Sequence, residues 1–185
     1  MFNARSIVKK VLDVYFEVIL QLDWPDMISI TETWLRNDIP DTVFSACKGY
    51  SVFRRDRCGK KGGGVAILTK PGVSCHSIDV PSDTYVEAVG VCYSGPSESF
   101  IMCTVYRPPC CDSSCVSSFL RLLRSLESYD KGPFYLSMYN PPPPTKFSAI
   151  FPGSPAARTA STMYMQRRLV SGFLKLLVQK LFEIG

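Results

Sequence analysis

DMISITETWL, at Asp26–Leu35, is an apolar run that ends in a carboxylate and a tryptophan. Met27–Thr31 predicts a short buried strand, because its residues are apolar or β-forming and because Pro25 and Asn37 punctuate its two sides. Glu32 then lies at the C-terminal end of the strand. In open α/β sheets, ligands and catalytic groups gather at this end because helices cover the faces. From this stretch alone, a solvated glutamate at a strand-to-loop corner is the favoured interpretation, and a site at Glu32 is the alternative that other stretches of the chain support.

The composition is that of an ordinary soluble domain. A chain of 185 residues with 46% hydrophobic and 20% charged residues fits one domain, or one domain plus an appendage. The formal net charge of +5 suits an anionic partner such as nucleic acid. Many basic proteins bind no nucleic acid, so the charge permits this partner without requiring it.

No targeting segment is visible in the sequence. Met1–Lys10 lacks the apolar core of a signal peptide, and no apolar stretch is long enough for a transmembrane segment. This predicts an intracellular protein, nuclear or cytoplasmic, whose eight cysteines are reduced thiols. Cys110, Cys111 and Cys115 cluster, but there is no paired CxxC, and His76 is the one histidine. That spacing does not favour a zinc site.

Two helices and a series of strands are expected. Ser6–Leu22 predicts an amphipathic helix capped by Ser6, and Ser113–Ser128 predicts a second one that also starts from a serine cap. Turn residues between Val65 and Tyr106 predict a meander of mostly antiparallel strands. The order of elements predicts a layered α/β or α+β domain. The further strands are expected at Tyr50–Phe53, Val65–Thr69, Tyr85–Tyr93, Phe100–Tyr106 and Phe134–Leu136.

A basic, glycine-rich loop follows the strand at Tyr50–Phe53. Glycine removes the side-chain barrier to a phosphate backbone, and lysine and arginine neutralise its charge. The loop is therefore a candidate nucleic-acid contact, and a flexible, solvated hairpin loop is an equal alternative. Its candidate binding residues are Arg54, Arg55, Lys60 and Lys61.

Tyr106 and Arg107 end the strand at Phe100–Tyr106, directly before two prolines. A tyrosine hydroxyl and a planar guanidinium at a fixed strand end can hold a phosphate. Structural capping of the strand by the same two residues is the competing interpretation.

One ordered set of motifs carries a family resemblance. The set resembles the endonuclease domain of non-LTR (LINE-type) retrotransposons, within the endonuclease/exonuclease/phosphatase superfamily. The resemblance spans about residues 1 to 142. The motifs, in chain order, are NARSI from Asn3, ITETWL from Ile30, FRRDR from Phe53, GGGVAIL from Gly62, a strand with Glu87, VYRPP from Val105, and LSMYNPP from Leu136.

The resemblance implies an α/β sandwich of the DNase I-like kind, with mixed, largely antiparallel sheets. It implies that Asn3 and Glu32 order a Mg²⁺ ion, that Tyr106 contacts the scissile phosphate, and that Asn140 orients the attacking group. DNA is the implied partner. Only two residues precede Asn3, so the strand before it is expected to be clipped and the sandwich incomplete.

Two departures from the family pattern bear on activity. Met138 stands where the family has its catalytic aspartate, and a thioether neither accepts a proton from water nor ligates Mg²⁺ usefully. The closing Ser-Asp-His motif has no counterpart after Pro144. His76 lies between two predicted strands and is not expected to be the base. The sequence therefore predicts a Mg²⁺-dependent DNA endonuclease domain that is inactive as it stands, and a non-catalytic remnant or weak nucleic-acid-binding interaction module is the alternative.

The chain changes character after the last of these motifs. We expect a partial endonuclease-like domain at 1–142 and a Pro/Ala/Ser-rich linker at 143–161. Residues 162–185 predict a basic amphipathic helix. Filling a gap on its own domain is the simpler use of this helix, and docking on a membrane or a partner is the alternative.

Overall fold

The computed structural model describes residues 1–108, 114–129, 132–139 and 160–165. In chain order, the helical and turn-like elements are the 3-10 helix η1 (Ile7–Lys9), α1 (Val11–Asp13), the π-helix η2 (Val14–Leu20), the 3-10 helix η3 (Asp41–Cys47) and α2 (Ser114–Ser128). The strands are β1 (Phe2–Asn3), β2 (Met27–Thr31), β3 (Ser51–Arg55), β4 (Val65–Thr69), β5 (Cys75–Ile78), β6 (Glu87–Ser94), β7 (Ser99–Tyr106), β8 (Phe134–Tyr139) and β9 (Ala160–Met165).

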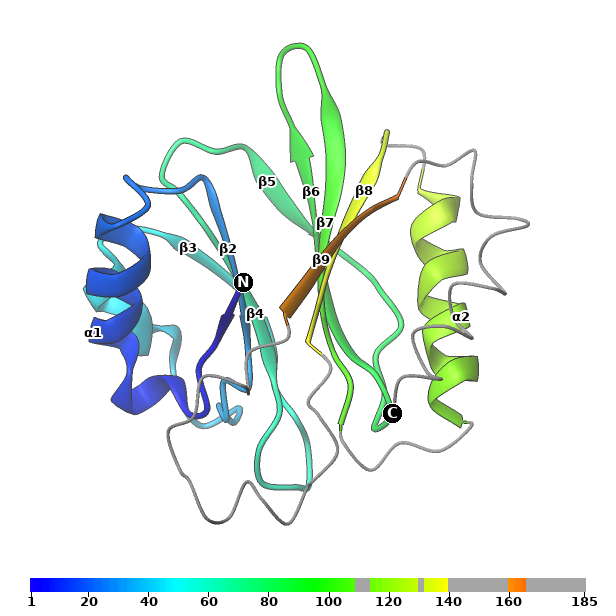
Figure 1. Ribbon diagram of the computed structural model, residues 1–185, viewed down its shortest axis with the longest axis horizontal. Helices are drawn as coiled ribbons and strands as arrows, with labels where there is room; N and C mark the ends of the chain where they lie inside the picture. The colour runs from blue at the N-terminus through cyan, green and yellow to red at the C-terminus, as the bar shows by residue number, and fades with distance from the viewer. Residues whose placement is uncertain (109–113, 130–131, 140–159, 166–185) are drawn as a thin grey trace.

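The strands form two mixed sheets that lie face to face between helices (Figure 1). The first sheet has the order β1-β2-β4-β3, with β1 and β2 parallel and the other pairs antiparallel. The second has the order β5-β6-β7-β8-β9, in which β7 and β8 are the parallel pair. The predicted α/β sandwich with mixed, largely antiparallel sheets is confirmed.

The buried side chains form three layers, because successive residues of each strand point to opposite faces of its sheet. On the first sheet, one face packs against the helical segment 7–20 and η3, through residues such as Ile28, Ile30 and Leu68. On the second sheet, the outer face packs against α2. The two inner faces meet in a smaller apolar cluster made by Val65, Ile67, Val89, Val91 and Tyr106. Successive side chains of a strand point to opposite faces of the sheet, so neighbouring residues on one strand pack in different layers of the core.

The two sheets are aligned so that one end of the sandwich collects several strand ends. Ser29 on β2 and Thr104 on β7 are hydrogen-bonded across the sheets, with Oγ1 of Thr104 donating to Oγ of Ser29 at 2.9 Å. Strands β2, β7 and β8 run the same way, whereas β4 and β6 run the opposite way. The C-terminal ends of β2, β7 and β8 therefore meet the starts of β4 and β6. We call this end the site end.

The predicted helix at Ser6–Leu22 differs from the structure. The segment is divided into η1, α1 and η2. Ser6 has φ 84° and makes no side-chain cap hydrogen bond, so the predicted cap is wrong. Val8, Leu12 and Leu22 are apolar residues of this segment, yet their side chains are 48%, 56% and 63% exposed. Because three short helical pieces of different pitch replace one continuous α-helix, a single 3.6-residue period does not decide which side chains of this segment face the sheet.

Most predicted strands lie where they were expected, with two exceptions. Val65–Thr69 does not belong to the meander, because it pairs with β2 and β3 in the first sheet. The meander consists of β5, β6 and β7, and β5 was not predicted. Its sequence CHSI carries little apolar signal, since an edge strand buries few side chains. His76 is an exposed residue within β5 and not in a loop between strands.

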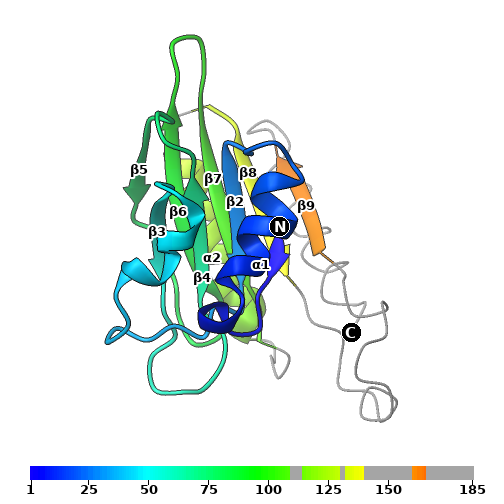
Figure 2. The same cartoon turned by 90° about the vertical axis from the view of Figure 1, so that its left-hand side faces the viewer.

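The expected C-terminal helix is wrong at its start. Thr162–Met165 belongs to β9, which pairs antiparallel with β8. Pairing satisfies backbone groups on β8 that would otherwise form a bare sheet edge. In Figure 2, β9 stands beside β8 at this edge of the sandwich. The predicted linker up to residue 159 and the rest of the helix lie outside the described residues.

The described cysteines are not all in the same oxidation state. Cys47, Cys58, Cys75, Cys92 and Cys103 are free thiols, as predicted. Cys115 is disulfide-bonded, so the prediction of reduced thiols is wrong there.

Within the part of the chain that the structure describes, no helix is both long and apolar enough to cross a membrane.

Asp83 ties the loop before β6 to α2. Its Oδ1 accepts the backbone N–H groups of Tyr85 and Val86 at 2.8 and 2.9 Å. Its Oδ2 accepts from the Ser118 hydroxyl at 2.7 Å and from Arg121 Nη2 at 2.6 Å. Burial acts to raise the pKa of Asp83, but these hydrogen bonds and the charge of Arg121 outweigh it and lower that pKa.

Asp83→Ala is therefore expected to destabilise the protein in a pH-dependent way. A carboxyl whose pKa is lowered by folding contributes stability above its unfolded value of 3.8, and this contribution is lost as the pH falls through the folded value. The variant should lose about 1–3 kcal/mol at pH 7, because hydrogen bonds to a charged group are removed. Urea unfolding at pH 7 and pH 3 measures the difference. An equal loss at both pH values would contradict the assignment.

Candidate active site

Glu32 directly follows β2 and occupies a strained backbone position at the site end. Its φ is 58°, in the left-handed region that a non-glycine residue rarely adopts. The Ser6 N–H donates to its carbonyl at 2.9 Å, and the next residue, Thr33, donates its N–H to the Gly64 carbonyl at 3.2 Å. Such strain persists where neighbouring structure holds it, and it is concentrated at functional sites.

Tyr106, at the end of β7, reaches Glu32 across the two sheets. Its side chain is hydrogen-bonded to Glu32 and is buried. Burial raises the pKa of the Tyr106 phenol, and the hydrogen bond and negative charge of Glu32 raise it further. The ring of Tyr106 also faces Arg57, whose Cζ is 5.4 Å from the ring centroid. The phenol thus stays protonated and available as a donor.

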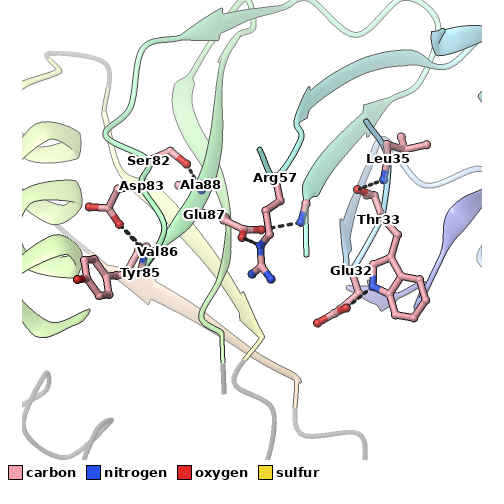
Figure 3. A network of polar contacts seen from close by, with 12 residues as sticks. Glu32, Thr33, Leu35, Arg57, Ser82, Asp83, Tyr85, Val86, Glu87 and Ala88 are labelled. Atoms are coloured by element: carbon pink, nitrogen blue, oxygen red, sulfur yellow. Dashed lines mark hydrogen bonds and ion pairs between the residues drawn. The ribbon is translucent and has the colours of Figure 1, made fainter. Parts of the chain in front are cut away.

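Glu87, at the start of β6, forms a buried ion pair with Arg57 (Figure 3). Arg57 Nε donates to Glu87 Oε1, and the Gly64 N–H donates to Oε2 at 2.6 Å. Burial raises the pKa of Glu87, while these two hydrogen bonds and the charge of Arg57 act against the rise. The negative charge of Glu32 also raises the pKa of Glu87. The pair therefore joins the second sheet to the loop that precedes β4.

Three polar oxygen atoms are buried on the inner faces with no hydrogen-bond partner among the described residues. They are Asn3 Oδ1, Thr31 Oγ1 and Ser137 Oγ. Asn3 and Thr31 are paired in register on β1 and β2, and Phe2 packs on the outer cluster, so Asn3 faces inward. Buried polar atoms normally have partners, so these oxygens are the positions where a ligand or an ordered water would supply a missing hydrogen bond or metal contact.

Glu32 and Asn3 fit a hydrated magnesium ion. Mg²⁺ prefers oxygen ligands, and it commonly uses one or two protein groups while keeping several waters. Glu32 directly follows Thr31, the register partner of Asn3, so a carboxylate and an unpartnered amide oxygen come from two neighbouring strand ends. Among the described residues, no group of three or more His, Cys, Asp or Glu side chains gathers as a metal site. The residues therefore fit a weakly held ion better than a fully protein-ligated one.

The candidate basic residues lie in different environments. Arg54 is in β3 and not in the loop, where it pairs with Asp41 at 2.9 Å and donates to the Ile39 carbonyl at 2.6 Å. Arg55, which ends β3, is exposed, as are Lys60 and Lys61 in the loop. Arg107, after β7, is half-buried, and burial lowers the pKa of its guanidinium.

Among the described residues, neither Met138 nor His76 supplies a catalytic base at the site end. Met138 is 3% exposed and packs in the cluster beneath α2 with Phe134 and Leu136. Neighbouring Ser137 is outside that cluster, so alternation places it on the inner face. Asn140 lies outside the described residues. His76 is in register with Cys92, about five residues or roughly 17 Å along β6 from Glu87.

Trp34, Arg57 and Glu87 take part in the site although they were not predicted as site residues. The Trp34 indole N–H donates to Glu32 Oε2. Glu87 carried a signal in the sequence, because one carboxylate in the apolar run YVEAVGV must be paired when the strand is buried. Arg57 was hidden among the other basic residues of its loop, and its partner is 30 residues away.

Comparison with known proteins finds structures of the same fold, but no curated protein of similar sequence. No protein-family model matches the sequence, and no curated protein matches it either. An endonuclease/exonuclease/phosphatase family protein from Bacteroides thetaiotaomicron superposes with a TM-score of 0.56 at 13% identity, over 74% of this chain and 59% of that one. Another from Bacteroides vulgatus gives 0.54 at 12% identity, over 74% and 62%.

A retrotransposon protein is among the structural neighbours. The endonuclease domain of TRAS1, a telomere-specific non-LTR retrotransposon, superposes with a TM-score of 0.50 at 12% identity, over 75% of this chain and 55% of that one. The chain thus spans 55–62% of the solved structures compared. Identities this low establish the fold alone. The chain has the fold of the endonuclease/exonuclease/phosphatase, or DNase I-like, proteins.

Proposed function

We propose that the site end binds the phosphate backbone of DNA together with a hydrated Mg²⁺ ion, as in the endonuclease domain of a LINE-type retrotransposon. The observation that carries this proposal is the hydrogen bond between Tyr106 and Glu32, which come from different sheets. The order of sequence motifs favours the retrotransposon lineage. A second candidate is a non-catalytic remnant or interaction module that holds no metal and binds nucleic acid at most weakly, and the buried position of Met138 favours it.

Each residue at the site end has its own role in the proposed binding of metal and DNA. Glu32 and Asn3 would hold the ion, which neutralises charge on a phosphate ester when it is bound. Tyr106 keeps its proton, which it donates to Glu32 in the absence of a ligand; contact with a phosphate oxygen would redirect this single donor to the phosphate. Lys60 and Lys61 are exposed, and they supply positive charge for the flanking backbone.

Turnover is expected to be very slow in this chain. Water attack on a phosphodiester needs a positioned base, and loss of one such group typically costs about 10²–10⁴-fold in rate. Position 138 supplies no base, because its side chain is a thioether inside the cluster beneath α2. The proposal is therefore binding of metal and DNA without turnover attributable to the family mechanism.

Nicking of supercoiled plasmid in the presence of Mg²⁺ tests this proposal. We expect the purified chain to nick no faster than Glu32→Ala, and we expect Mg²⁺ to bind weakly to the wild type and not to Glu32→Ala in calorimetry. Glu98→Ala is the matched control, because Glu98 is exposed in the loop between β6 and β7, away from the site end. Nicking that Glu32→Ala abolishes and Glu98→Ala preserves would show an active nuclease. Failure of Mg²⁺ and DNA to bind would contradict the proposed function.

A further inference from the structure

Trp34 is an unusual neighbour for a candidate metal-binding carboxylate. It is a large aromatic residue that is 37% exposed, at the rim of the site and two residues after Glu32. Its indole N–H donates to Glu32 Oε2, and the dashed line at the labelled Glu32 carboxylate in Figure 3 marks this hydrogen bond. An indole has one polar group, which is a donor only, so this group of Trp34 is directed entirely at the carboxylate.

The backbone is arranged to make this contact. Glu32 and Trp34 both have positive φ, 58° and 54°. The Trp34 N–H donates to the Gly63 carbonyl at 2.9 Å, which fixes the turn against the loop before β4. A Cβ added to Gly62 would lie 3.6 Å from Trp34 Nε1 and 4.0 Å from Glu32 Oε2. The glycine loop thus closes directly over the hydrogen bond between the two side chains.

We infer that Trp34 is a positioning residue that holds the Glu32 carboxylate in the orientation needed for a cation. The inference rests on the proposed function, and it adds a role for a residue outside the metal and phosphate contacts. Tyr106 is hydrogen-bonded to the same carboxylate from the other sheet. Two donors fix the rotamer of the glutamate, and a carboxylate with about four lone-pair sites can still bind a cation. Partners that orient a ligating carboxylate typically change metal affinity 10–100-fold when they are lost.

Trp34→Phe is the direct test, because phenylalanine keeps an aromatic ring and lacks the N–H. Calorimetric titration with MgCl₂ is expected to show about 10–100-fold weaker binding than in the wild type. Trp24→Phe is the matched control, because Trp24 packs against Tyr15 and Tyr50 on the outer face of the first sheet. This control should bind Mg²⁺ as the wild type does. Equal affinity of Trp34→Phe and the wild type would overturn the inference.

A second measurement uses the wild-type chain and does not depend on the folding of a variant. The two indole N–H groups give separate resonances in ¹⁵N-labelled protein. Addition of Mg²⁺ should shift the Trp34 resonance and leave that of Trp24 in place, and Glu32→Gln should abolish the shift. A wild type that binds Mg²⁺ in calorimetry without any shift at Trp34 contradicts the inference alone. A wild type that binds no Mg²⁺ contradicts the proposed function and removes the inference with it.

Discussion

Glu87→Ala is expected to lower the free energy of unfolding by about 3–5 kcal/mol, because removing one partner of a buried ion pair leaves the other charge uncompensated. Glu87 is 4% exposed, and the side chain of Arg57 is 15% exposed. The substitution also removes the acceptor of the Gly64 N–H. The loss should therefore affect the contact between the sheets and the glycine loop together. Urea unfolding monitored by far-UV circular dichroism measures it.

An exposed ion pair supplies the control for this prediction. Arg36 and Asp38 pair at 2.7 Å on the surface, with side chains 72% and 64% exposed. Asp38→Ala should cost at most about 1 kcal/mol, since exposed ion pairs contribute little. A double variant, Arg57→Met with Glu87→Leu, should recover much of the loss of Glu87→Ala, because it removes both buried charges. If Glu87→Ala unfolds within 1 kcal/mol of Asp38→Ala, the buried pair is not a major contributor.

Met138→Asp should destabilise the protein by about 3–5 kcal/mol at pH 7, although it restores the residue type that the family resemblance places there. Position 138 lies in the cluster beneath α2 with Phe134, Leu136 and Val105. An unpaired carboxyl in such surroundings stays protonated through a pKa rise of several units, and each unit costs about 1.4 kcal/mol. Chemical unfolding is again the measurement.

The pH dependence of the same variant has a definite sign. A carboxyl whose pKa is raised by folding is tolerated best below its unfolded pKa, and stability is lost as the pH rises. Met138→Asp should therefore be closer to the wild type at pH 4 than at pH 7. Met138→Leu is the control, and it should cost less than about 1.5 kcal/mol at both pH values. A Met138→Asp variant that is as stable as the wild type and gains Glu32-dependent nicking would place this side chain in the site.

The sequence by itself determined the elements whose local signal is strong. Met27–Thr31 and Val65–Thr69 have the strand bounds that their apolar runs predicted, because punctuating residues or turns bound both. α2 follows its helical periodicity, with Phe119, Leu122 and Leu126 buried. The position of Glu32 after a strand followed from the same signal. Local propensity and periodicity suffice where a segment buries one regular face.

Only the tertiary structure decided which of these elements meet. The contact between Ser29 and Thr104 joins residues 75 apart in the chain, and the contact between Arg57 and Glu87 joins residues 30 apart. Pairings of this kind depend on how the sheets align, which no local window of sequence contains. The edge strands β5 and β9 form for the same reason, since each pairs with a neighbour that offers an open edge. The contact of Trp34 with Glu32 is local in sequence, but it exists because the backbone of Ser6 and Gly63, brought from two other segments, holds the turn in its strained conformation.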